Sequence, residues 1–231
     1  MAAPTPIVSI VIPTLARAES LATLLDSIDA HATVPHEVIA VTVERDTPTQ
    51  QLLATRPHIT NLVDPERTGF VRAANRGFAA ATAEFVCQLN DDCLLMPHTL
   101  GNALNFLHAP AHASVGLAAF FHDTPVRRNI AHQIVVEDIA YAVLHVRGLL
   151  YANFGLCRRE LGERLGWFDE RYVMYGADPD FSLKVWHHAG LSVAPCPGSL
   201  VRHAELDDDR AAEERAAQSS DNAALFEKWG I

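Results

Sequence analysis

The sequence has few positive charges and no long apolar run. Its 231 residues include 18 Lys and Arg against 28 Asp and Glu, which gives a formal net charge of −10. Such a chain offers no broad basic surface for nucleic acid or an anionic membrane, so we expect no nucleic-acid partner and a phosphate ligand held locally by a metal ion or a few arginines. Apolar runs such as residues 115–121 fall far short of the roughly 20 residues that a spanning helix needs, so we expect no transmembrane segment.

Cysteine is also scarce. The four cysteines have no Cys-x-x-Cys spacing, which removes the common zinc motifs, and a chain of this length needs no disulfide to hold its core. They are Cys87, Cys93, Cys157 and Cys196. The first residues lack the basic and then apolar pattern of a signal peptide. Reduced thiols and a cytoplasmic location are the expectation.

Short β-branched runs that alternate with amphipathic helices indicate an α/β fold. Residues 7–12 read as a buried strand that Pro13 ends, and residues 38–43 repeat the pattern. Between them, four apolar residues at spacings i, i+3, i+4 and i+7 share one helix face. They are Leu21, Leu24, Leu25 and Ile28. Strand, helix and strand at this spacing predict right-handed βαβ units in an open sheet, and the length predicts a single domain.

The remaining elements predict a sheet whose second half is mixed or antiparallel. Strands are expected over 59–63, 85–89, 140–146 and 148–156, and helices over 70–78, 159–165, 179–189 and 211–228. The fold class is therefore α/β, with a mostly parallel, mixed central sheet flanked by helices.

Two carboxylates directly follow the predicted strand 85–89. Asp91 and Asp92 come at the carboxyl end of a parallel strand, where open α/β sheets bind their ligands. Paired carboxylates on a tight turn can ligate Mg²⁺ or Mn²⁺ beside a diphosphate. A solvated acidic turn is the alternative, because Asn and Asp are common turn formers.

A third carboxylate, Asp178, precedes Pro179 at the start of a predicted helix. It can accept a proton from an attacking hydroxyl, or it can simply cap the helix. Burial would raise the pKa of such a base toward neutral pH, whereas the helix N-terminus would lower it. Arg72 and Asn75, on the helix 70–78, can contact phosphate or ribose or lie on a solvated surface.

Four motifs that occur in order along the chain together resemble family 2 glycosyltransferases of the GT-A fold. They are Val8–Thr14, Gly69-x5-Asn75-Arg76-Gly77, Leu89–Asp92, and the stretch from Gly166-Trp167-Phe168-Asp169 to Asp178-Pro179-Asp180. The resemblance covers residues 7–205. It implies one Rossmann-like GT-A domain over 1–231, with a nucleotide-sugar-binding half near 7–110, an acceptor-binding half near 111–205 and a C-terminal helix near 211–228.

The same resemblance implies a role for individual residues. Asp178 takes the position of the catalytic base, and Asp92, Asp91 and His203 take those of the ligands to Mn²⁺ or Mg²⁺. The implied donor contacts are Pro13, Thr14, Arg17, Glu44, Asp46, Arg72, Asn75 and Asp91. The implied acceptor contacts are Asp180 and Trp167.

The chain departs from the family pattern at three places. Asn90 replaces the first acid of the metal motif, and Ala177 stands where a glutamate usually precedes the base. The second strand ends in Glu44-Arg45-Asp46, so Glu44 or Asp46 substitutes for the aspartate that usually faces the nucleotide base. The Gln-x-x-Arg-Trp motif of processive synthases is missing, which favours the addition of a single sugar.

These features lead to the prediction of an inverting, metal-dependent transferase that moves one sugar from a nucleotide-diphosphate donor to an acceptor hydroxyl. The family suggests a glycan or lipid-linked acceptor of surface polysaccharide or glycolipid synthesis. A peripheral location at the inner face of the membrane and a homodimer are further expectations. Residues 121–139 are expected to form a loop that sets specificity.

Two other functions stay open. A sugar-phosphate nucleotidyltransferase shares the fold type, but its Gly-rich loop after the first strand is absent, because residues 13–17 read Pro-Thr-Leu-Ala-Arg. An inactive carbohydrate- or nucleotide-binding protein of the same fold would explain Asn90 and Ala177.

Overall fold

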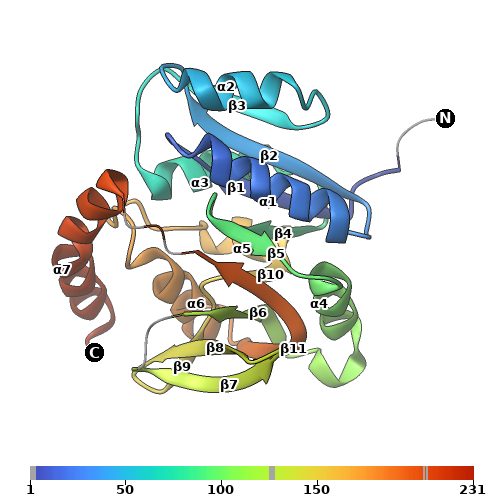
Figure 1. Cartoon of the computed structure of the whole chain (residues 1–231). Helices are drawn as coiled ribbons and strands as arrows, with labels where there is room; N and C mark the ends of the chain where they lie inside the picture. Colours follow the sequence, from blue (N-terminus) through green and yellow to red (C-terminus); the bar gives the residue numbers. More distant parts are fainter. Residues whose placement is uncertain (1–3, 125–127, 205, 207) are drawn as a thin grey trace.

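A computed structural model describes residues 4–124, 128–204, 206 and 208–231, and Figure 1 shows a curled mixed sheet flanked by helices. This is the α/β class that the sequence predicts. The strands are β1 (Val8–Pro13), β2 (His36–Val43), β3 (Thr60–Asp64), β4 (Phe85–Gln88), β5 (Cys93–Leu95), β6 (Val115–Asp123), β7 (Ile130–Val136), β8 (Ile139–Val146), β9 (Leu149–Tyr151), β10 (Gly155–Arg158) and β11 (Ser192–His203). The helices are α1 (Ala18–His31), α2 (Thr47–Ala54), α3 (Phe70–Ala80), α4 (Thr99–His108), α5 (Arg159–Leu165), α6 (Ala177–His187) and α7 (Asp209–Trp229), with a 3₁₀ turn at Pro110–His112.

The sheet runs in the order β3-β2-β1-β4-β10-β6-β11-β5, with β7, β8 and β9 attached beyond β6. Strands β1 to β4 pair in parallel, and β10 lies antiparallel between β4 and β6. Since β11 is parallel to β6, strands β1, β2, β4, β6 and β11 all end at the same edge of the sheet. Residues at the ends of these strands can therefore form one site.

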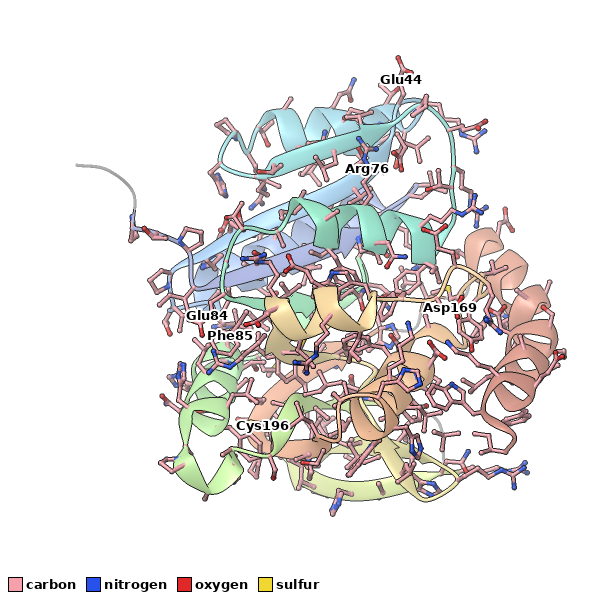
Figure 2. The ribbon with its side chains drawn as sticks, turned by 180° about the vertical axis from the view of Figure 1, so that it is seen from behind. Glu44, Arg76, Glu84, Phe85, Asp169 and Cys196 are labelled. Atoms are coloured by element: carbon pink, nitrogen blue, oxygen red, sulfur yellow. The ribbon has the colours of Figure 1, made fainter. Side chains whose placement is uncertain are left out.

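Two apolar cores cover the two faces of this sheet. Val8, Ile10 and Ile12 of β1 face a core that α1 and α4 close, whereas Val11 faces a core built with α3, α5 and α6. The alternation follows from the two-residue repeat of a strand. The view from behind in Figure 2 shows α3, α5 and α6 on the second face.

Several elements differ from the sequence prediction. The predicted strand 148–156 is two strands, β9 and β10, and the predicted loop 121–139 contains β7, while its residues 125–127 lie outside the described part of the chain. The prediction missed α2, α4, β5, β6 and β11. Strand β11 was hidden by Pro195, Pro197 and Gly198, which read as loop residues; the register shifts between Pro195 and Leu200 accommodate them.

Helix α3 packs on β1 through a glycine, which leads to a prediction about stability. A Cβ atom on Gly77 would lie 2.3 Å from Val11 Cγ1 and 3.2 Å from Val41 Cγ2. We expect Gly77→Ala to lower the free energy of unfolding by about 1–3 kcal/mol, because the helix must move off the sheet. Urea unfolding measures this, with Gly101→Ala as control, since a Cβ there meets no atom within 4 Å. Equal losses in the two variants would contradict this packing.

No helix within the described part of the chain combines the length and the apolar character that crossing a membrane requires.

Candidate active site

Asp92 and His203 meet at the edge where the strands end, and Asp91 precedes Asp92 in the same turn. Asp91 and Asp92 follow β4 and are 0% and 7% exposed. His203, the last residue of β11, brings its Nε2 to 3.1 Å from Asp92 Oδ1. The three residues predicted as metal ligands thus come from one edge of the sheet, although more than a hundred positions separate the histidine from the acids.

A divalent cation fits the chemistry of this edge. Asp92 Oδ1 is buried, and its contact with His203 Nε2 at 3.1 Å lacks full hydrogen-bond geometry, so among the described residues this oxygen is one that a cation would complete. Carboxylate oxygens suit Mg²⁺ and Mn²⁺, and an imidazole is also accepted by Mn²⁺. Cys93 has its sulfur within 4.8 Å of the same ligand atoms, but burial raises the pKa of its thiol well above the usual value. Sulfur suits softer metals than Mg²⁺ and Mn²⁺, which prefer oxygen, so Cys93 is the least suitable ligand of this group.

Arg17 supplies positive charge to this cluster. Its Nη1 lies 2.9 Å from Asp92 Oδ2 and 3.3 Å from Asp91 Oδ1, while Nε and Nη2 donate to Asp208 at 2.7 and 2.9 Å. Burial raises the pKa of Asp92, but the close contact with His203 and the charges of His203 and Arg17 outweigh it, so the pKa lies below its usual value. Asp92 is accordingly ionised at neutral pH.

Asp178 lies in the first turn of α6, is half-buried, and lines a pocket with Gln88, Asn153 and Trp167 among apolar side chains. Burial raises the pKa of its carboxyl to about 8, and a hydrogen bond with Asn153 opposes the rise only in part. A carboxylate with a pKa close to neutral pH is suited to accept and release a proton.

A short connection joins Asp178 to the acid and histidine cluster. Between β9 and β10, Asn153 hydrogen-bonds to Asp178, and the next residue, Phe154, sets its ring edge-on to His203 with centroids 5.3 Å apart. The ring of Phe154 also packs edge-on against His122, with ring centroids 5.4 Å apart. Consecutive residues thus contact the proposed base and a proposed metal ligand.

A second pocket lies at the carboxyl ends of β1 and β2. Its lining includes Pro13, Thr14, residues 41–43, Asp64 and residues 67–70. The Thr14 hydroxyl is buried and has no hydrogen-bond partner among the described residues, so it is available to a ligand. The pocket therefore lies where open α/β sheets bind their ligands.

Glu44 and Asp46, expected to face a nucleotide base, take other places. Glu44 is exposed and points outward at the top of Figure 2. Asp46 accepts from the Ala16 amide at 2.7 Å and from the Thr49 amide at 3.4 Å, so it caps α2 and holds the loop after β1. The carboxylate that lines the pocket is Asp64, which forms an ion pair with Arg76.

The remaining predicted contacts gather around residues 167–176. Arg72 is exposed and lies 3.3 Å from Glu170. Asn75 brackets the backbone of Phe168, donating to its carbonyl at 2.9 Å and accepting from its amide at 3.1 Å. Asp180 has 0% exposure. Trp167 stacks on Phe78 of α3, with centroids 4.4 Å apart, and lines the Asp178 pocket.

Sequence reasoning missed Asp64 and His122. Asp64 directly follows a predicted parallel strand, so the rule that ligands bind at strand ends could have found it. His122 sits in β6, which was not predicted, and is buried with its Nδ1 unpaired among the described residues. Burial, with the charge of His203, lowers the pKa of His122 to about 4, so it is a neutral imidazole at pH 7.

A family profile described as Glycosyl transferase family 2 matches residues 9–166, which is more than half of the chain. The chain belongs to this family. It is a glycosyltransferase enzyme, and the match includes Asp91 and Asp92 but stops before Asp178 and His203.

Individual relatives of this family 2 glycosyltransferase are distant. An uncharacterized glycosyltransferase, YwdF of Bacillus subtilis, is 24% identical over 97% of this chain and 84% of its own length. The O-antigen biosynthesis protein RfbC of Myxococcus xanthus is 27% identical over 90% of this chain, which spans only 18% of that protein.

Solved structures share the fold. The mannosyltransferase PcManGT of Pyrobaculum calidifontis, in complex with GDP-Man and Mn²⁺, has a TM-score of 0.64 at 21% identity. The match covers 95% of this chain and 64% of the mannosyltransferase chain. TarS 1-349 of S. aureus, in complex with UDP-GlcNAc, has a TM-score of 0.66 at 16% identity, with coverages of 95% and 70%. These neighbours are GT-A glycosyltransferases, so the family 2 chain has the GT-A fold.

Proposed function

We propose that this family 2 glycosyltransferase moves a single sugar, with inversion, from a nucleotide-diphosphate donor to an acceptor hydroxyl. The observation that carries the proposal is the Asn153–Phe154 connection, which contacts Asp178 on one side and His203 on the other. A base and a candidate cation site on one connection suit a reaction in which a hydroxyl attacks and a diphosphate leaves.

Asp92, Asp91 and His203 would hold Mn²⁺ or Mg²⁺, as the ion in the structure of the mannosyltransferase suggests by analogy. When bound, the cation neutralises charge on the departing diphosphate. The pocket with Thr14 and Asp64 would receive the nucleoside, because it opens at the same edge of the sheet as these ligands. The donor-binding half near 7–110 and the acceptor-binding half near 111–205 of one domain are assigned on this basis.

Asp178 acts on the acceptor. One of its carboxylate oxygens takes the proton of the hydroxyl, and the hydroxyl oxygen forms a bond to the anomeric carbon from the face opposite the diphosphate. The bond from that carbon to the diphosphate oxygen breaks, and the electron pair leaves with the nucleoside diphosphate. Attack from the opposite face inverts the anomeric configuration.

The acceptor is proposed from the chemistry of a relative. The name of the Myxococcus protein places it in O-antigen synthesis, which favours a glycan or lipid-linked acceptor of a surface polysaccharide. Work on such an acceptor would place the protein in the cytoplasm at the inner face of the membrane. A homodimer is the proposed assembly.

Nucleotide release tests this function. We expect GDP-mannose, UDP-GlcNAc or another common nucleotide sugar to release nucleoside diphosphate in the presence of Mn²⁺, and EDTA to stop the release, because water can replace the acceptor hydroxyl. Chromatography of the products measures both arms. An inactive binding protein would bind the nucleotide without releasing free sugar, and release that continues in EDTA would contradict the role of the metal.

A further inference from the structure

The C-terminal helix α7 binds residues 173–175, which directly precede α6 and Asp178. Asp221 of α7 is 2% exposed, and its carboxylate accepts three consecutive backbone amides. The donors are Val173 at 3.1 Å, Met174 at 2.8 Å and Tyr175 at 2.9 Å. Residues 173–175 belong to no helix or strand, so this side chain satisfies amides that no regular element pairs.

A second set of contacts joins the end of α7 to Asp180, in the first turn of α6. The Asp180 carboxylate is fully buried, and its Oδ1 lies 2.7 Å from Lys228 Nζ and 2.8 Å from Trp229 Nε1, both at the end of α7. Lys228 Nζ also lies 2.7 Å from Asp169 Oδ2. Burial raises the pKa of Asp169, but the hydrogen bond and charge of Lys228, together with Arg171, bring it to about 2. Figure 2 shows Asp169 beside α7.

The segment that α7 contacts, residues 169–180, is also closely packed within itself. Tyr172 donates its hydroxyl to Asp180 Oδ1 at 3.2 Å, and a Cβ on Gly176 would lie 2.2 Å from the Tyr172 ring. A displacement of Tyr172 or Asp180 is therefore passed to residues 176–178. The Asp180 charge has two cationic partners, Lys228 at Oδ1 and Lys184, whose Nζ lies 3.5 Å from Oδ2. Loss of Lys228 removes the nearer one, so the buried charge is less well compensated and the segment is expected to shift.

We propose that α7 is a positioning strap for the catalytic base, in which Lys228 and Asp221 set the place of Asp178 without touching the reacting atoms. This proposal rests on the proposed role of Asp178 as the base. The strap residues Asp221, Lys228 and Trp229 contact the segment 169–180. They do not line the pocket that holds Thr14 and Asp64, and they do not belong to the group of Asp92 and His203. They act on the rate of the chemical step and leave donor binding alone.

Lys228→Met removes the charge and keeps most of the side chain. With saturating GDP-mannose or UDP-GlcNAc, whichever releases nucleotide, we expect kcat to fall about 10- to 100-fold, the loss typical of misplacing a catalytic group by about 1 Å. The dissociation constant of the nucleoside diphosphate with Mn²⁺ should stay the same in calorimetry. Lys228→Arg should restore most of the rate, and Glu227→Gln, an exposed neighbour on α7, should have no effect. If Lys228→Met fails to fold, Asp221→Asn repeats the test at the hydrogen bonds to residues 173–175.

A double-mutant cycle separates positioning from general stabilisation. If the strap acts through Asp178, Lys228→Met should lower kcat little further in an Asp178→Asn background, because residues that act as one unit are not additive. Independent, additive losses would overturn the strap. Normal kcat in Lys228→Met and Asp221→Asn, with Asp178→Asn inactive, would also overturn it but would leave the proposed function standing. Full activity of Asp178→Asn would instead overturn the base assignment, and the strap with it.

Discussion

Replacing Asp178 by Asn lowers nucleotide release at saturating donor by about 10²- to 10⁴-fold, the expected loss of a general base. Asparagine has nearly the same volume and is as good a residue near a helix start, but it cannot accept the proton. Stability and the affinity for nucleoside diphosphate should therefore stay close to the wild-type values. Steady-state kinetics and urea unfolding measure the two effects separately.

The pH profile gives this experiment a second readout. Because burial raises the pKa of Asp178 to about 8, the wild-type kcat should rise with pH up to about that value, as the carboxyl loses its proton. The Asp178→Asn variant should lack this rise. Asp138→Asn is a matched control, since Asp138 is exposed and has a φ of +64°, which asparagine also adopts. A variant at position 178 that works at the wild-type rate would mean that another acid is the base.

Replacing Asp92 by Asn abolishes the effect of Mn²⁺ on nucleotide affinity. For the wild type, we expect calorimetry to show tighter binding of UDP or GDP with Mn²⁺ than with EDTA. The loss of an ionised ligand should weaken Mn²⁺ binding by at least about 100-fold, since even the loss of residues that only orient ligands costs 10- to 100-fold. His203→Ala should act in the same direction, because its Nε2 faces Asp92.

A neighbouring thiol provides the control for the metal experiment. Cys93 lies beside Asp92, but Mn²⁺ prefers oxygen ligands to sulfur, so Cys93→Ser should keep the full response to Mn²⁺. Equal nucleotide affinity of the wild type with Mn²⁺ and with EDTA would refute the metal site. A loss in Cys93→Ser as large as in Asp92→Asn would instead make the thiol a ligand.

Local patterns were enough to predict the first half of the sheet. Short β-branched or apolar runs predict strands β1, β2 and β4, and the spacing of apolar residues from Leu21 to Ile28 predicts α1. The acids after β4 could also be placed at the binding edge, because parallel strands end together. Each of these signals lies within about ten residues of sequence.

The strands of the second half could not be predicted in this way. Strand β11 contains two prolines and a glycine, and only its pairing with β6 and β5 holds these residues in a sheet. That pairing carries His203 to Asp92. A contact between residues so far apart depends on the order of strands in the sheet, which no local periodicity encodes.

The roles of single polar side chains were likewise decided by packing. Asp64 lines the pocket at the ends of β1 and β2, where Glu44 or Asp46 was expected to face a nucleotide base. Asp180 is a buried partner of α7, where an acceptor contact was expected. A carboxylate reads the same in sequence whether it faces solvent, a cation or a lysine.

The pKa of Asp178 illustrates the division most directly. From sequence, it was evident that a carboxylate opens a helix after Gly176 and Ala177, and that the helix start and burial push its pKa in opposite directions. Only the tertiary structure decided the balance, since residues from β4, β9–β10 and α6 enclose the side chain and burial prevails. The sequence determined which group is present, whereas its protonation depends on the water that the folded chain excludes, and that exclusion is a property of the whole packed structure.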